Sequence, residues 1–75
     1  MNLEIARIYA ETGSIIKVTA QPMWNKWVLN IECNIAAADK SGLLETARGE
    51  TRFFKSLDSV YRCAKQIAPD MLVVF

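Results

Sequence analysis

A strict alternation of apolar and polar residues runs along residues 27–35 and constrains the fold more than any other feature of the chain. The apolar positions are Trp27, Leu29, Ile31, Cys33 and Ile35, and the positions between them are Val28, Asn30, Glu32 and Asn34. A period of two residues is typical of a strand with one buried face and one solvated face. The chain is therefore expected to build a β-sheet that is covered on one side.

Three further stretches have the composition of strands. Residues 3–10 are rich in β-branched and aromatic residues, residues 15–20 place Ile16, Val18 and Ala20 on one face, and residues 71–75 are wholly apolar. Residues 11–14 are expected to form a turn, and residues 21–22 to end the second strand, because proline cannot donate to a ladder. A hairpin through residues 23–26 then leads into the alternating strand. The final strand must be covered on both faces or paired within the sheet.

Residues 43–54 are expected to form a hairpin that turns at Arg48-Gly49. This register opposes Thr46 with Thr51, Glu45 with Arg52, and two apolar pairs, Leu44/Phe53 and Leu43/Phe54. Arg-Gly is a weaker turn signal than Asn-Gly, so one continuous strand is the alternative.

Residues 56–68 have the pattern of an amphipathic helix. Ser56 is placed to cap its start, Asp58 suits the helix dipole, and Pro69 ends it. The apolar stripe consists of Leu57, Val60, Tyr61, Ala64, Ile67 and Ala68. The predicted fold is a single α+β domain over residues 1–75. It has a mostly antiparallel sheet of four to six strands in a meander, one C-terminal helix on one face, and a short final strand reached by a crossover.

Composition limits the classes of function. The chain has 75 residues, 52% of them apolar, and a net charge of +1, which argues against a protein that coats DNA through a strong basic excess. Charged residues near the start argue against a signal peptide, and no apolar run approaches the roughly 20 residues that a membrane helix needs. The expected location is the cytoplasm.

No motif for catalysis, phosphate binding or metal binding is present. The chain has no histidine, and its two cysteines are expected to be buried thiols in a reducing compartment. We therefore expect neither an enzyme nor a metal or other cofactor.

Nucleic-acid binding is one functional hypothesis. If Ala6, Ile8 and Ala10 face the helix, the open sheet face gathers aromatic and basic residues of the kind that bind single strands. This candidate face consists of Arg7, Tyr9, Lys17, Trp24, Lys26, Asn30 and Arg52. A second candidate is a basic helix face made of Lys55, Arg62 and Lys65. An ordinary solvated surface accounts for the same residues.

Protein–protein interaction or self-association is the leading hypothesis. The apolar surplus, the terminal strand and the uncovered sheet face all suit a protein partner or a homodimer. The two tryptophans are expected to have different environments. Trp27 shares the phase of the core, whereas Trp24 lies in the turn after Pro22. Trp24 either covers the edge of the core or stands free for a partner.

The stretch from Arg48 to Pro69 resembles small uncharacterised proteins carried on bacterial plasmids and integrative elements. The matching residues are Arg48, Gly49, Arg52, Phe54, Ser56, Leu57 and Asp58. They form a strand–cap–helix junction and carry no functional residues, so the resemblance implies a bacterial accessory protein without assigning it a role.

Overall fold

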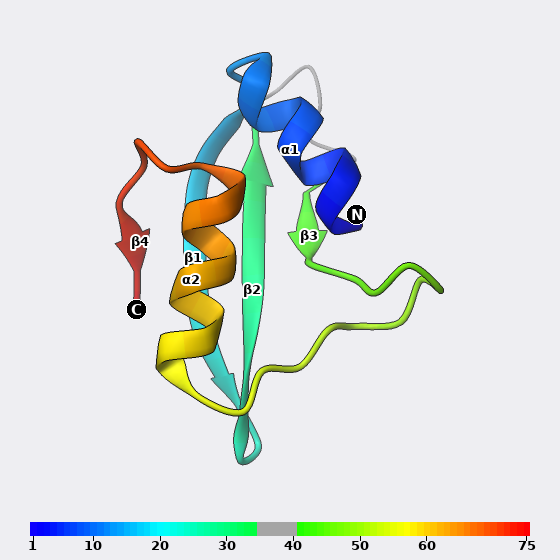
Figure 1. The fold of residues 1–75 in the computed structure, drawn as a ribbon, viewed down its shortest axis with the longest axis vertical. Coiled ribbons are helices and arrows are strands. Elements are labelled where there is room, and N and C mark those ends of the chain that lie inside the picture. Colours follow the sequence, from blue (N-terminus) through cyan, green and yellow to red (C-terminus); the bar gives the residue numbers. More distant parts are fainter. Residues whose placement is uncertain (35–40) are drawn as a thin grey trace.

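A mixed four-stranded sheet and two helices make up the fold (Figure 1). The computed structural model describes residues 1–34 and 41–75. The elements are α1 (Leu3–Glu11), β1 (Ile15–Met23), β2 (Lys26–Cys33), β3 (Gly42–Leu43), α2 (Leu57–Ile67) and β4 (Val73–Val74). The strand order is β3-β2-β1-β4, with β1–β2 and β2–β3 antiparallel and β4 parallel to β1. The α+β class is confirmed, but the expected antiparallel meander with a single helix is only partly matched.

Residues 3–10 form the helix α1, and the strand predicted there is wrong. The side chain of Asn2 caps the helix by accepting a hydrogen bond from the Ile5 N–H at 3.0 Å. At the other end Gly13 has a φ of 73°, and the Ser14 N–H donates to the Tyr9 carbonyl at 2.8 Å. This is a Schellman cap, which glycine favours. The predicted turn at residues 11–14 is therefore the C-terminal cap of a helix.

The apolar residues of α1 follow a helical spacing that places one side of the helix on the core. Ala6 is fully buried, and Leu3, Tyr9 and Ala10 are partly buried against the core. Packing of this stripe outweighs the strand preference of the isoleucines and the tyrosine. Because α1 packs against α2, both helices lie on one side of the sheet (Figure 1).

The hairpin of β1 and β2 is confirmed, with Met23 opposite Lys26. Val18 and Ala20 are buried as expected, whereas Ile16 is exposed because a register irregularity between Ile15 and Lys17 puts Ile15 in the core instead. β1 continues through Pro22, opposite Trp27. The N–H and the carbonyl of Trp27 are both hydrogen-bonded to Phe54, on the other side of β2 from Pro22. The missing N–H of Pro22 therefore leaves neither group of Trp27 without a partner.

The alternation in β2 is confirmed for its core face. Leu29, Ile31 and Cys33 are buried and Trp27 is partly buried against them. Val28, expected on the solvated face, is also fully buried, although it is not part of the core cluster. The expected last member, Ile35, lies outside the described residues.

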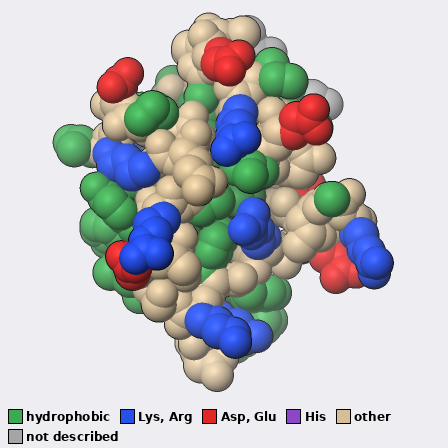
Figure 2. Space-filling model, viewed as in Figure 1, with side chains coloured by type: hydrophobic (Ala, Val, Ile, Leu, Met, Phe, Trp, Pro, Cys, Tyr) green, Lys and Arg blue, Asp and Glu red, His purple; other side chains and the backbone are tan. Residues whose placement is uncertain are grey.

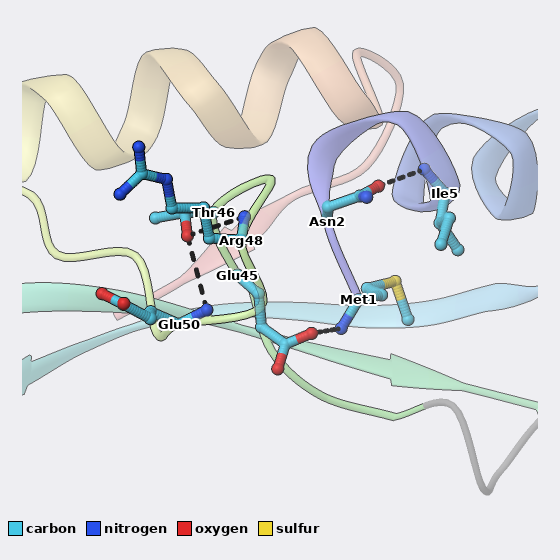
Figure 3. A network of polar contacts seen from close by, with 7 residues as sticks. All are labelled: Met1, Asn2, Ile5, Glu45, Thr46, Arg48 and Glu50. Atoms are coloured by element: carbon cyan, nitrogen blue, oxygen red, sulfur yellow. Dashed lines mark hydrogen bonds and ion pairs between the residues drawn. The ribbon is translucent and has the colours of Figure 1, made fainter.

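Residues 44–52 form a hairpin that projects from the edge of β2, which we call the projecting hairpin. Its predicted register is wrong by one residue: Glu45 pairs with Thr51, and the Arg52 N–H donates to the Leu44 carbonyl at 2.9 Å. The turn has three residues, 47–49, and Gly49 has a φ of 86°. In Figure 3 the Thr46 hydroxyl accepts hydrogen bonds from the backbone N–H groups of Arg48 and Glu50, at 3.3 and 3.4 Å.

The two apolar ends of the predicted hairpin do not pair with each other. Leu43 pairs with Asn30 and Phe54 pairs with Trp27, so both ends add to the same edge of β2. The projecting hairpin therefore leaves the edge of β2 after Leu43, and the chain returns to the same edge at Phe54.

The predicted helix over residues 56–68 is confirmed as α2. The Ser56 hydroxyl accepts from the Ser59 N–H at 3.1 Å, and the Ser59 hydroxyl accepts from the Ser56 N–H at 3.3 Å, which closes a capping box. Val60, Cys63, Ala64 and Ile67 are buried. Leu57 and Tyr61 belong to the predicted stripe but remain 38% and 41% exposed.

The terminal apolar segment pairs within the sheet, as expected. Val73 lies beside Val18 and Val74 beside Thr19, in parallel orientation. It is not covered on both faces, however, since Leu72 is 85% exposed and Phe75 is 64% exposed. Over the described residues, neither helix has the length and apolar character needed to cross a membrane.

Candidate functional site

The seven residues of the predicted binding face lie in three places. Lys17 and Asn30 are on the face of the sheet that no described helix covers, opposite Glu32 and Thr19 respectively. Trp24 and Lys26 lie at the turn of the β1–β2 hairpin. Arg7 and Tyr9 are on α1, and Arg52 lies on the helix side with Arg7, so these three do not join the open face. The correction follows from the helical structure of residues 3–11.

A groove of about 660 Å³ lies between α1 and the projecting hairpin. Arg7 and Arg52 line it from opposite elements, together with Glu4, Glu11 and Glu45. Glu45 accepts a hydrogen bond from the Met1 α-amino group at 2.9 Å (Figure 3). Because three acidic and two basic side chains line the groove, its field does not strongly favour ligands of one sign.

Cys63 lies in the core behind these arginines. It is 6% exposed, and burial raises the pKa of its thiol, while the charges of Arg52 and Arg7 oppose this shift. The protonated thiol is a weak nucleophile. Cys33 is also buried, and both cysteines are free, as the sequence predicts. Among residues 1–34 and 41–75, no group of three or more potential metal ligands is present.

The turn between β1 and β2 carries an exposed aromatic pair. Trp24 is 87% exposed and has a φ of 57°. Its ring stacks on that of Phe53, with the centroids 5.9 Å apart and the planes inclined by 30°. The Nζ atom of Lys26 lies 5.9 Å from the centre of the Phe53 ring. Sequence reasoning missed Phe53, because the predicted register paired it with Leu44.

A positive φ at a tryptophan is costly, because the Cβ atom approaches the following carbonyl oxygen. The cost is about 1–2 kcal/mol relative to glycine. With the ring almost fully exposed, burial does not offset this cost. The indole is therefore held outward by the fold and not by contacts with the core.

The basic helix face predicted from Lys55, Arg62 and Lys65 is not a free cationic surface. Arg62 forms an ion pair with Asp58 at 2.8 Å, and Lys65 donates to the Met71 carbonyl at 2.6 Å. Only Lys55, which precedes α2, makes no ion pair or side-chain hydrogen bond to the described residues. Figure 2 shows lysine and arginine side chains spread over this side of the molecule instead of gathered into one patch.

A second exposed apolar surface surrounds β4. It consists of Leu57, Tyr61, Leu72, Val74 and Phe75, and we call it the β4 surface. Tyr61 and Phe75 stack with their ring centroids 6.2 Å apart, which joins α2 to the terminal segment. Lys65 lies 5.6 Å from the centre of the Tyr61 ring at the rim of this surface. β4 has β1 on one side and is the last strand of the sheet, so its other edge is unpaired among the described strands.

Comparison of the chain with protein-family models, with curated proteins and with solved structures found no match.

Proposed function

We propose that this protein is a non-enzymatic accessory protein that acts by self-association through the β4 surface. The observation that carries the proposal is an edge strand flanked by exposed apolar side chains. Leu72, Val74 and Phe75 are 85%, 42% and 64% exposed beside a strand edge that no other described strand pairs. Apolar patches of this kind on small proteins commonly contact partners.

Apart from the two-residue length of β4, the edge lacks the features that keep sheet edges apart. Natural edge strands usually carry a lysine, a proline or a bulge that prevents pairing with another chain. Residues 71–75 contain no charged residue and no proline. An edge without such protection supports pairing with a further strand.

A second copy of this chain is the partner that the chemistry favours. An uncharged apolar segment is complementary to itself, and antiparallel pairing of two β4 strands across a two-fold axis would join two sheets into one. The stacked Tyr61 and Phe75 rings would extend the contact onto α2. The interface would then contain the large apolar groups that the monomer leaves exposed.

Sedimentation velocity over a wide range of protein concentrations tests this proposal. We expect reversible dimers of the unmodified protein and monomers of Leu72→Lys, because a charge at this position opposes both burial and pairing. Ile8→Lys is the matched control, since Ile8 is 52% exposed but lies on α1, and it should dimerise normally. A protein that stays monomeric up to millimolar concentration would overturn the proposal, as would dimers that survive Leu72→Lys.

A further inference from the structure

The end of the β1–β2 hairpin carries a second surface, which consists of Trp24, Lys26, Phe53 and Lys55. We call it the hairpin-end surface, and we infer that it binds single-stranded nucleic acid by stacking a base on Trp24 and contacting phosphates with the two lysines. This inference does not depend on self-association, since the surface and β4 are formed by different residues.

The backbone presents Trp24 outward in a conformation that another residue would adopt more easily. Glycine or asparagine is usual in two-residue hairpin turns at a positive φ, whereas Trp24 adopts 57° with 87% of its surface exposed. Strained and exposed aromatic residues are found where function requires them.

Phe53 supports the indole from beneath. The rings are stacked at 5.9 Å and 30°, which leaves the other face of Trp24 open to a planar group. Phe53 is held in place by its neighbour Phe54, which is 6% exposed and bonded to β2 through its backbone. The pair is thus a preformed platform, and stacking on such platforms tolerates any base.

The charge around the platform is positive. The bridge between Trp27 and Phe54 places Lys26 and Lys55 at adjoining positions of the ladder. Residues 12–31 and 51–57 contain no Asp or Glu, and the next acidic residue, Asp58, is engaged with Arg62. In Figure 2 the lower end of the molecule shows basic and apolar side chains without acidic ones on the face drawn.

Single strands fit this chemistry better than the alternatives. A duplex keeps its bases stacked on each other and offers the platform no free ring face. An acidic peptide would satisfy the lysines but leave the outer face of Trp24 without a planar partner. A single strand supplies both a base and its phosphates.

Two measurements test the inference. Trp27→Phe leaves Trp24 as the only tryptophan, so its fluorescence reports the site directly. We expect an oligothymidylate of about 12 nucleotides to quench this emission at low salt. If Trp27→Phe does not fold, anisotropy of the labelled oligonucleotide with the unmodified tryptophans gives the same affinity. Contact with two phosphates predicts a slope of about −1.4 for the logarithm of the association constant against the logarithm of salt concentration.

Variants locate the site. Trp24→Asn, which tolerates a positive φ, should weaken binding about tenfold or more, the expected loss of one stacked base. Lys26→Ala and Lys55→Ala should each flatten the salt dependence, and Arg48→Ala, in the exposed turn of the projecting hairpin, should change neither the affinity nor the salt dependence. Unaltered binding by Trp24→Asn, or no binding by the unmodified protein at low salt, would overturn the inference. Equal affinity for a duplex or for polyglutamate would also overturn it, the latter in favour of an acidic protein partner. The Leu72→Lys variant should bind normally, which separates this site from self-association.

Discussion

Trp27 and Phe54 exchange both of their backbone hydrogen bonds: the Trp27 N–H donates to the Phe54 carbonyl at 2.9 Å, and the Phe54 N–H donates to the Trp27 carbonyl at 2.8 Å. The pair joins the chain just before α2 to the start of β2. It also separates two neighbouring phenylalanines, since Phe54 lies in the core at 6% exposure and Phe53 is 39% exposed.

Alanine substitution should distinguish the two phenylalanines. We expect Phe54→Ala to lower the free energy of unfolding by about 3–4 kcal/mol, because it removes a buried ring and leaves a cavity. Phe53→Ala should cost less, about 1 kcal/mol, because this ring is partly exposed and loses chiefly its stack with Trp24 and its contact with Lys26. Urea denaturation of both variants checks this, and equal losses would contradict the burial of Phe54 alone.

The C-terminal cap of α1 makes a prediction about Gly13. Gly13→Ala should destabilise the protein by about 1 kcal/mol, because an L-residue is strained at a φ of 73°. An added Cβ at this position meets no atom within 4 Å, so the cost is conformational and not steric. Gly13→Asn should lose less, and denaturant midpoints of the two variants would show the order. The opposite order would argue against the left-handed cap.

The capping box of α2 predicts a non-additive pair of substitutions. Ser56→Ala should cost about 1 kcal/mol, since it removes the acceptor for the Ser59 N–H. Ser59→Ala should cost less, because water can reach the exposed Ser56 N–H. The double variant should lose less than the sum of the two, because the hydroxyls also bond to each other at 3.1 Å. Thermal unfolding of the three variants completes the cycle, and strict additivity would mean that the two serines act independently.

Burial of Cys63 predicts a loss of stability in alkali. Burial raises the pKa of this thiol above its ordinary value of 9.0, against the smaller opposing effect of Arg52 and Arg7. Below this value the thiol is protonated in both states and stability is unaffected. Above it the unfolded state loses its proton first, so the free energy of unfolding falls as pH rises.

Chemical denaturation at a series of pH values from about 8 to about 10 measures this effect, with Cys63→Ala as the reference. The variant is expected to be less stable throughout but to lose less stability as pH rises. All other groups are common to the two proteins, so their contributions cancel in the difference. Parallel curves would show that the thiol is not buried.

Strain at Trp24 predicts a variant that gains stability while losing the proposed binding of single-stranded nucleic acid. Trp24→Gly should raise the free energy of unfolding by up to about 1 kcal/mol, because glycine adopts a positive φ without strain, although the stack on Phe53 is lost. Asn25→Gly is the control and should bring no gain, because Asn25 does not have a positive φ. Thermal unfolding measures both, and a clear destabilisation by Trp24→Gly would show that the indole serves the fold.

The elements that depend on local pattern were predictable from the sequence. The β1–β2 hairpin and α2 follow from a period of two residues, a capping serine and a period of 3.6 residues. The prediction for residues 3–10 was wrong because their composition favours a strand, while their spacing also fits a helix. The decisive signals were Asn2 and Gly13, one at each end of the segment, which cap a helix and would be incidental around a strand.

Pairing between distant segments was not predictable in the same way. The projecting hairpin differs by one residue from its predicted register because the left-handed Gly49 completes a three-residue turn. Leu43 and Phe54 complement each other as an apolar pair, yet both add to β2. A single sequence does not reveal with which of two apolar segments a strand will pair.

Among the candidate residues as well, those that depend on local pattern were predictable and those that depend on distant pairing were not. The phase of β2 separates Trp24 from the core but leaves open whether it covers the edge of the core or stands free; at 87% exposure it stands free. The open face includes Arg7 and Tyr9 only if residues 3–10 form a strand, and these residues form α1 instead. Phe53 was not predicted as a candidate residue, because its contact with Trp24 depends on the bridge between Trp27 and Phe54.

The short parallel pairing of β4 with β1 has a consequence for local opening of the structure. Its two residue pairs, Val18/Val73 and Thr19/Val74, join segments from near opposite ends of the chain, and α2 must be in place before they can meet. Loop closure over such a separation is entropically expensive and only a few hydrogen bonds offset it. The amide protons of Val73 and Val74 should therefore exchange with solvent faster than those of β2. If a second chain adds to this edge, the exchange of these two amide protons should slow as protein concentration rises. The weakly held β4 would then report dimer formation.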